Sequence, residues 1–156
     1  MTTGDSTQLG DYRLDVLWPV GTGFSDPGND SSVVVALSAP PECEQCLSGL
    51  FLGDLGEKPQ RILHGRHKLA SVDVVKVSHH GSADQFVGLY QTLGARVGLV
   101  GVGADNTYGH PTTRALDILR TSGTAVFRSD LHGMVALSRN PEGKLVVWSA
   151  KSAMPR

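Results

Sequence analysis

The stretch VDVVKVSHHGS, residues Val72–Ser82, decides the fold and raises the question of function. Four of its first six residues are valine, and so apolar a run predicts a strand inside a covered sheet. The run then ends on His79, His80 and Gly81. Two imidazoles at the end of a buried strand need partners, because a buried polar group costs free energy unless it is hydrogen-bonded. The histidine pair is therefore a candidate for function.

Short strands precede and follow this stretch. Residues 12–18 (YRLDVLW) alternate as a strand does, and 31–38 (SSVVVALS) predicts a second strand. The segment 48–54 (SGLFLGD) predicts a partner for that second strand, across a loop that holds two cysteines. Further strands are expected at the end of the chain, the last two joined by the hairpin loop RNPEG; these segments are 96–102, 124–129, 133–138 and 144–149.

Three helices are expected between these strands. The first begins near Pro59 within residues 55–70, and the second covers 83–94, where Phe86, Leu89, Tyr90 and Leu93 share one face and Gly94 supplies the stop. The third covers 110–123, with Pro111 in its first turn. The order of elements predicts a layered α/β domain with a mixed sheet, since the hairpins require antiparallel pairing.

Length and composition limit the class of protein and the number of domains that this chain can form. The chain has 156 residues, a net charge of −1 and 40% hydrophobic residues, which is typical of one soluble globular domain. No apolar run approaches the roughly 20 residues needed to span a bilayer, and no signal peptide is recognisable. Without a basic run, a stand-alone DNA-binding module is disfavoured. We expect a polar or disordered tail over 1–11, one domain over 12–150 and a second tail over 151–156.

Cys43 and Cys46 form a single C-x-x-C motif. A structural zinc site would need two further ligands at suitable spacing, and the sequence has no second cysteine pair. A local disulfide on a loop and two free thiols both remain open. Redox chemistry of the thioredoxin type is disfavoured because the motif precedes a strand instead of opening a helix.

Three predicted strands end abruptly in polar residues beside a glycine. One ends at Asp54, one at His79 and His80, and one in the loop that contains Asp105, Asn106 and His110. In layered α/β proteins the loops at strand ends converge into binding sites. One carboxylate and several imidazoles at one rim are suitable ligands for a divalent metal. Because neighbouring side chains of an extended chain point to opposite sides, His79 and His80 are not expected to bind the same ion.

Each of these residues also has a structural reading. Asp54 is suited to a turn or a helix cap, and His110 to capping the helix that follows it. Asn29 and Asp30 read as a turn. The remaining histidines are expected to be structural or solvent-exposed: His64 and His67 on a solvated helix face and His132 in a turn.

Taken in order, six segments resemble one family, the metallo-β-lactamase-like domain of ComEC-type competence proteins, in its C-terminal half. The segments are LDVLWP, NDSSVVVAL, LFLGD, VDVVKVSHHGS, VGADNTYGHP and FRSDLHGMVAL. The combination of HHGS and YGHP after a strand that ends in GD is specific, and the resemblance covers residues from about 12 to 137. It implies an αββα sandwich that binds divalent metal, zinc or manganese, and hydrolyses phosphodiesters of an incoming single DNA strand.

The resemblance also implies roles for single residues. Asp54 would bridge two metal ions, one of His79 and His80 would bind the second ion, and the pair would be catalytic together with Asp54 and His110. Asn29, Asn106 and His110 would contact the substrate. The family reads Asn-x-Asn-Ser where this chain has Asn29-Asp30-Ser31-Ser32, so Ser31 departs from the pattern. The C-x-x-C loop is not a family feature.

The first metal-binding motif of the family, a His/Asp cluster after an early strand, does not occur in these residues, nor do the hydrophobic channel helices. We therefore expect an incomplete domain that lacks catalytic activity without its N-terminal half. Its parent would lie in the bacterial cell membrane with this domain outside the cytoplasm, and an exposed sheet face would favour a homodimer. Two alternatives stay open: a non-catalytic binding or assembly module of the same fold, and a hydrolase for another phosphoester.

Overall fold

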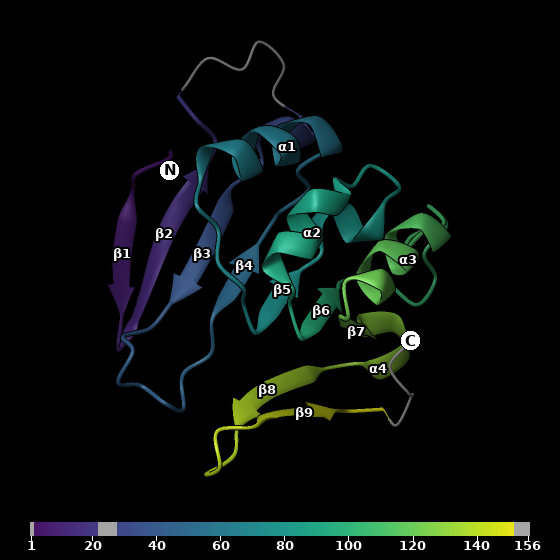
Figure 1. The fold of residues 1–156 in the computed structure, drawn as a ribbon. Helices are drawn as coiled ribbons and strands as arrows, with labels where there is room; N and C mark the ends of the chain where they lie inside the picture. The colour runs from purple at the N-terminus through teal and green to yellow at the C-terminus, as the bar shows by residue number, and fades with distance from the viewer. Residues whose placement is uncertain (1, 22–27, 152–156) are drawn as a thin grey trace.

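The computed structural model describes residues 2–21 and 28–151, which form one seven-stranded mixed sheet, a two-stranded hairpin and several helices (Figure 1). Four strands pair antiparallel in sequence order: β1 (Ser6–Leu9), β2 (Tyr12–Trp18), β3 (Val34–Ser38) and β4 (Gly49–Phe51). Three parallel strands follow: β5 (Val74–Lys76), β6 (Val97–Val100) and β7 (Ala125–Arg128). The sheet therefore changes from antiparallel to parallel at β4.

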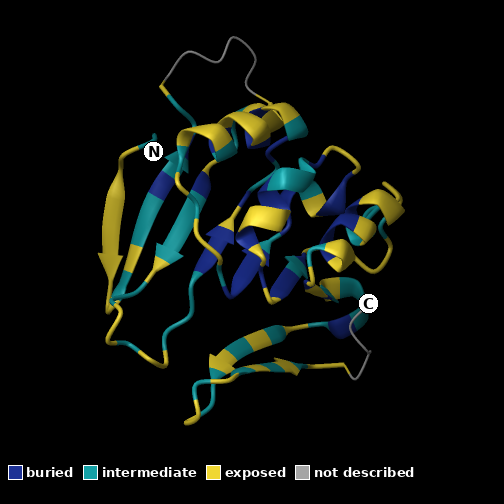
Figure 2. Ribbon diagram, viewed as in Figure 1, coloured by how far each residue is buried: buried dark blue, intermediate teal, exposed yellow. Residues whose placement is uncertain are grey.

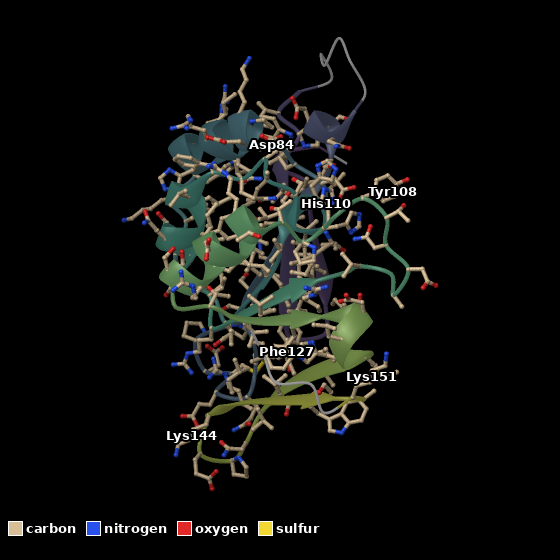
Figure 3. The ribbon with its side chains drawn as sticks, turned by 90° about the vertical axis from the view of Figure 1, so that its right-hand side faces the viewer. Asp84, Tyr108, His110, Phe127, Lys144 and Lys151 are labelled. Carbon is tan, nitrogen blue, oxygen red and sulfur yellow. A yellow bond between two sulfur atoms is a disulfide. The ribbon has the colours of Figure 1, made fainter. Side chains whose placement is uncertain are left out.

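The helices α1 (Glu57–Arg66), α2 (Val87–Leu93) and α3 (Thr113–Thr121) connect the parallel strands and lie on the same face of the sheet (Figures 1 and 3). Each buries one stripe, which in α2 consists of Leu89, Tyr90 and Leu93. Gly94 ends α2 in the left-handed conformation, as the sequence predicts. The apolar core lies between these stripes and the central strands, which Figure 2 colours as buried.

The central strand behaves as its sequence predicts. Val74 and Val75 are buried, and β5 lies between two parallel neighbours. The sheet face opposite the helices is less well covered. Phe51, Lys76 and Leu99 pair across β4, β5 and β6 in register on this face, and Phe51 remains exposed. The outer strands β1 to β3 are also mostly half-buried or exposed (Figure 2).

A hairpin of β8 (Val135–Arg139) and β9 (Leu145–Ser149) closes the described chain. The short helix α4 (Ser129–His132) leads into it from β7. Arg139 at the end of β8 forms an ion pair with Asp73, 2.7 Å between Nη2 and Oδ1, just before β5 begins. This ion pair places the end of β8 near the amino end of β5, whereas β8 begins after α4, where Ser129 bonds Val102 in the loop that follows β6. The hairpin is seen at the bottom of Figure 3.

Several local predictions need correction. Ser6–Leu9 forms the edge strand β1 within the expected tail 1–11, because its backbone pairs with β2 although all four of its side chains are exposed and three are polar. The first helix begins at Glu57, two residues before Pro59. Residues 83–86 precede α2, since the side chain of Gln85 hydrogen-bonds to the preceding turn. Pro111 precedes α3, whose N-cap is Thr112 with its hydroxyl accepting the amide N–H of Ala115.

The predicted α/β class with a mixed sheet is confirmed. Within residues 2–21 and 28–151, helices α1 to α3 cover one sheet face, so the outer layer that an αββα sandwich needs on the other side is not formed by these residues. Of the predicted C-terminal tail, only Lys151 belongs to the described residues. No helix in the described ranges is both long and apolar enough to cross a bilayer.

Candidate active site

A cleft of about 680 Å³ opens at the carboxyl ends of the parallel strands. It is lined by Asp54 after β4, by His79 and His80 after β5, and by the loop 101–110 after β6. The three polar strand ends that the sequence singles out therefore meet at one rim. Its size is within the usual range for small-molecule sites.

Asp54 is fixed by the turn that follows β4. Its backbone N–H donates to the hydroxyl of Ser32 at 3.1 Å, and the preceding Gly53 has a φ of +56°. A Cβ on Gly53 would lie 2.9 Å from the Cβ of Ser32, so this position requires glycine sterically as well as conformationally. Ser32 thus positions the backbone that carries the carboxylate; it matches the serine of the Asn-x-Asn-Ser pattern, but no role is predicted for it from the sequence.

Lys76 lies beside this carboxylate. Its ammonium donates to the carbonyl oxygens of Gly53 and Val77 at 3.0 and 3.2 Å, and lies 4.0 Å from Oδ1 of Asp54. Burial lowers the pKa of Lys76, and the negative charge of Asp54 partly opposes that shift. Lys76 therefore holds the turn that presents Asp54, and it is a cation close to the proposed metal ligand.

His80 presents one ring nitrogen toward Asp54. Its Nδ1 lies 2.6 Å from the carbonyl oxygen of Gly101, and since a carbonyl only accepts, Nδ1 carries the proton in this hydrogen bond. The neutral ring then has its lone pair on Nε2, which lies 3.7 Å from Oδ1 of Asp54. Two ligands bonded at about 2.1 Å to one tetrahedral ion are about 3.4 Å apart, so this pair is close to ligand geometry. A backbone carbonyl that orients a histidine is also a common partner of metal ligands.

His79 points elsewhere. The amide nitrogen of Asn29 lies 3.3 Å from both of its ring nitrogens, and its ring centroid is 5.5 Å from that of His110. The rings of His79 and His80 are 6.5 Å apart. The two rings diverge, but not for the predicted reason: residues 78–81 form a 3-10 turn, and both histidines have left-handed backbones with φ of 44° and 52°. The expected extended conformation is wrong.

A buried polar network supports this strained turn from behind. The amide nitrogen of Gln85 donates to the carbonyl oxygens of Ser78 and Ser82, and its amide oxygen accepts from the Tyr90 hydroxyl at 2.6 Å. Gln60 also donates to Gln85, at 3.1 Å. Burial raises the pKa of Tyr90, so its hydroxyl stays protonated and can donate. Sequence reasoning missed the roles of these residues, because no motif surrounds the two glutamines and Tyr90 reads only as part of an apolar stripe.

The loop 101–110 carries His110 and Asn106. The amide of Asn106 bonds the loop itself, donating to the carbonyl of His110 at 2.6 Å and accepting from the N–H of Tyr108 at 3.0 Å. Partial burial lowers the pKa of His110, and the neighbouring His79 and His80 lower it further. His110 therefore remains neutral to lower pH than an ordinary histidine. Tyr108 lines the same cleft and is 85% exposed; it belongs to the YGHP motif, but a functional role is predicted from the sequence only for His110 of that motif.

Only two of the three predicted metal ligands, Asp54 and His80, lie close enough together to bind one ion, so the described residues do not form a complete metal site. Asp54 and His80 are positioned for one ion, whereas His79 is directed to Asn29 and His110. No group of three His, Cys, Asp or Glu side chains in residues 2–21 and 28–151 is arranged to hold a metal. Since zinc and manganese sites use at least three protein ligands as a rule, these residues fit part of a ligand set.

The other candidates have structural contacts. Nε2 of His64 lies 2.8 Å from the Thr92 hydroxyl, and Nε2 of His67 lies 3.1 Å from the Leu17 carbonyl oxygen, so neither is simply a solvated face. His132 is fully buried in α4, where Nδ1 accepts from the N–H of Arg128. Cys43 and Cys46 form a disulfide, which decides between the two open readings.

Comparison with known proteins gives one relationship. The chain is 28% identical over 138 residues to ComE operon protein 3 of Bacillus subtilis (strain 168), an alignment that covers 85% of this chain and 16% of that protein. No family model matches the chain, and no solved structure matches it. The relationship points to a competence-related family, and the chain spans about a sixth of the length of this relative.

Proposed function

We propose that this chain is part of a metal-dependent phosphodiester hydrolase of a bacterial DNA-uptake system, built on a metallo-β-lactamase-like domain. The observation that carries the proposal is the pair formed by Asp54 and His80, 3.7 Å apart, with the other nitrogen of the imidazole bound to a backbone carbonyl. The similarity to ComE operon protein 3 supports the connection with competence.

Each residue of the cleft has a chemical task in this proposal. Asp54 and His80 Nε2 would bind a divalent ion, zinc or manganese, which when bound supplies an activated water and charge neutralisation at the phosphate oxygens. His79 and His110, whose rings are in contact, would exchange protons with the substrate or the leaving group. The low pKa of His110 favours its neutral form, which can accept a proton near neutral pH.

The incomplete ligand set limits what these residues do alone. A two-metal centre needs about six or more protein ligands, and the described cleft supplies two in suitable positions. The remaining ligands would come from the N-terminal half of the domain, as the resemblance implies. The chain alone would then bind metal weakly and have little activity.

Metal binding at His80 tests the proposal. We expect added Zn²⁺ to shift the Nε2 resonance of His80 in nitrogen NMR spectra of the chain, and to leave Nδ1 hydrogen-bonded. The shift should disappear in Asp54→Asn and persist in His64→Ala, the matched control with a histidine outside the cleft. A His80 resonance unaffected by saturating Zn²⁺ and Mn²⁺ would contradict the proposal.

One observation favours a second function, a non-catalytic binding module of the same fold: the described cleft has two metal ligands and no lysine or arginine among its lining residues. Cleavage of single-stranded DNA separates the two functions. The chain supplied with the missing half should cut DNA in Mn²⁺, and Asp54→Ala should abolish cleavage. A binding module would remain inactive in both forms.

A further inference from the structure

The loop 101–110 presents an unburied aromatic ring at the mouth of the cleft. Tyr108 is 85% exposed and lines the cleft together with Asp54, His80 and His110. Figure 3 shows Tyr108 and His110 near each other at the edge of the molecule. An exposed tyrosine leaves a large apolar surface in water, and covering that surface is favourable. Of the cleft-lining residues that the structure describes, Tyr108 is the only Phe, Tyr or Trp.

The backbone that carries the Tyr108 ring is fixed by hydrogen bonds on both sides. Asn106 binds both sides of the residue, accepting from the N–H of Tyr108 at 3.0 Å and donating to the carbonyl of His110 at 2.6 Å. The chain beyond is tied to the histidine turn, since the N–H of Thr112 donates to the carbonyl of Gly81 at 2.8 Å. With the backbone fixed, only the two side-chain torsions of Tyr108 remain to be ordered by a ligand, so little entropy opposes binding.

The rings of Tyr108, His110 and His79 lie one after another, and His79 is next to the proposed metal ligand His80. The centroids of Tyr108 and His110 are 6.5 Å apart and their planes differ by 29°, and His110 lies 5.5 Å from His79. A planar group laid on Tyr108 would therefore be nearly parallel to the His110 ring. The other end of the same ligand would reach the cleft where Asp54 and His80 lie.

The charge of the cleft indicates which ligand suits this row. A strand held only through its phosphates needs several lysines or arginines, and the described lining has none while it includes two carboxylates, Asp54 and Asp105. The nearby ammonium of Lys76 is 4.0 Å from Asp54 and donates to the carbonyl oxygens of Gly53 and Val77. A flat ring contributes affinity that does not depend on phosphate charge. A quaternary ammonium ester is less well suited, since such groups are bound by cages of several aromatic side chains.

We propose that Tyr108 is a stacking platform for one nucleobase of a single-stranded nucleic acid whose adjoining phosphodiester occupies the cleft. This inference rests on the proposed function and adds a residue that binds a base of the substrate. Base stacking is worth about 1–3 kcal/mol per base, which corresponds to roughly a 5- to 150-fold change in affinity.

The test compares two fluorescent single strands with the same number of phosphates, one of thymidines and one abasic, each titrated with and without Mn²⁺. The wild-type chain and Tyr108→Phe should bind the thymidine strand roughly 5- to 150-fold more tightly than the abasic strand. Tyr108→Ala should bind both strands equally. Trp148→Ala is the matched control, because Trp148 is 54% exposed on the hairpin and not in the cleft lining, and it should keep the preference.

Each other outcome overturns the inference in a distinguishable way. Equal binding of both strands by the wild type would reject the stacking platform and leave the proposed function intact. A base preference that survives Tyr108→Ala would assign stacking to another residue. Displacement of the thymidine strand by choline would indicate an ester with a quaternary ammonium group. Failure to bind either strand would reject the nucleic-acid substrate, while the Zn²⁺ response of His80 would still report on the metal site.

Discussion

The two ends of the parallel strands use similar residues in opposite ways. At the amino ends, Asp73 accepts from Arg139 at 2.7 Å and from the backbone and hydroxyl of Ser48 at 2.9 and 3.1 Å. At the carboxyl ends, Asp54 is 38% exposed in its side chain, and Nε2 of His80 and Nζ of Lys76 lie 3.7 and 4.0 Å from its Oδ1. The first carboxylate is fully bonded within the protein, and the second keeps its oxygens available. Pairing stabilises the fold, and incomplete pairing is what a binding site requires.

The backbone shows the same contrast. His79 and His80 of the cleft stand on a turn in which both have left-handed backbones, supported by the buried amide of Gln85. Such conformations are costly and persist only where the surrounding structure imposes them. At the hairpin end, β8 and β9 pair over five residues in regular register.

The largest expected loss of stability is at Gly81, in the turn that carries His79 and His80. Gly81 has a φ of +80°, and a Cβ there would lie 2.6 Å from the Cβ of Pro111. Gly81→Ala should destabilise the protein by about 3 kcal/mol, because left-handed strain adds to overpacking. Urea denaturation followed by circular dichroism measures the change.

The matched control is Gly123→Ala. Gly123 has a φ of +75°, and a Cβ added there would have no atom within 4 Å, so the strain alone should cost about 1 kcal/mol. Equal losses in the two variants would show that the contact between the histidine turn and the Pro111 segment has no energetic weight.

A smaller loss of stability is expected at the amino end of β5, where Arg139 pairs with Asp73. Arg139→Ala leaves Asp73 without its cation in a largely buried position, where the two side chains are 19% and 10% exposed. We expect a loss of about 2 kcal/mol, less than for a fully buried pair because water still reaches these groups. Thermal unfolding measures it, and hydrogen exchange should show faster exchange in β8 and β9.

The control for this variant is Arg13→Ala, which removes the exposed ion pair with Asp15, 59% and 33% exposed. Its loss should stay below about 0.5 kcal/mol. A hairpin that exchanges no faster in Arg139→Ala than in this control would show that other contacts hold it.

The smallest effect is a titration. The pKa of His110 is lowered by burial first and by His79 and His80 second. NMR titration should show His110 taking up its proton at lower pH than an ordinary histidine. His79→Ala should raise its pKa without restoring it fully, since burial remains, and His64→Ala should leave it unchanged.

The sign of the linked stability follows. A histidine whose folded pKa is lowered binds its proton more readily in the unfolded chain, so its contribution to stability is complete above the ordinary histidine pKa and is lost as pH falls from there through the lowered pKa of the folded state. An unchanged His110 pKa in His79→Ala would show that the neighbouring ring exerts no electrostatic effect.

Much of the fold was predictable from local pattern. The valine run before His79 predicts a buried central strand, and the stripe of Leu89, Tyr90 and Leu93 predicts α2, because periodicity reports directly which faces meet the core. The edge strand β1 was not predictable, since its four exposed side chains, three polar and one leucine, show no alternation, and the strand is defined by its backbone pairing with β2.

By itself, the sequence determined that three apolar strands end in Asp54, the histidine pair and the His110 loop, because strand ends are visible as abrupt changes from apolar to polar residues. Only the tertiary structure decided which imidazole faces the carboxylate. That choice depends on the carbonyl of Gly101, on Asn29 and on the amide of Gln85, whose contacts with the histidine turn leave no periodic trace in the chain. Long-range hydrogen bonds orient side chains, and a linear pattern does not contain them.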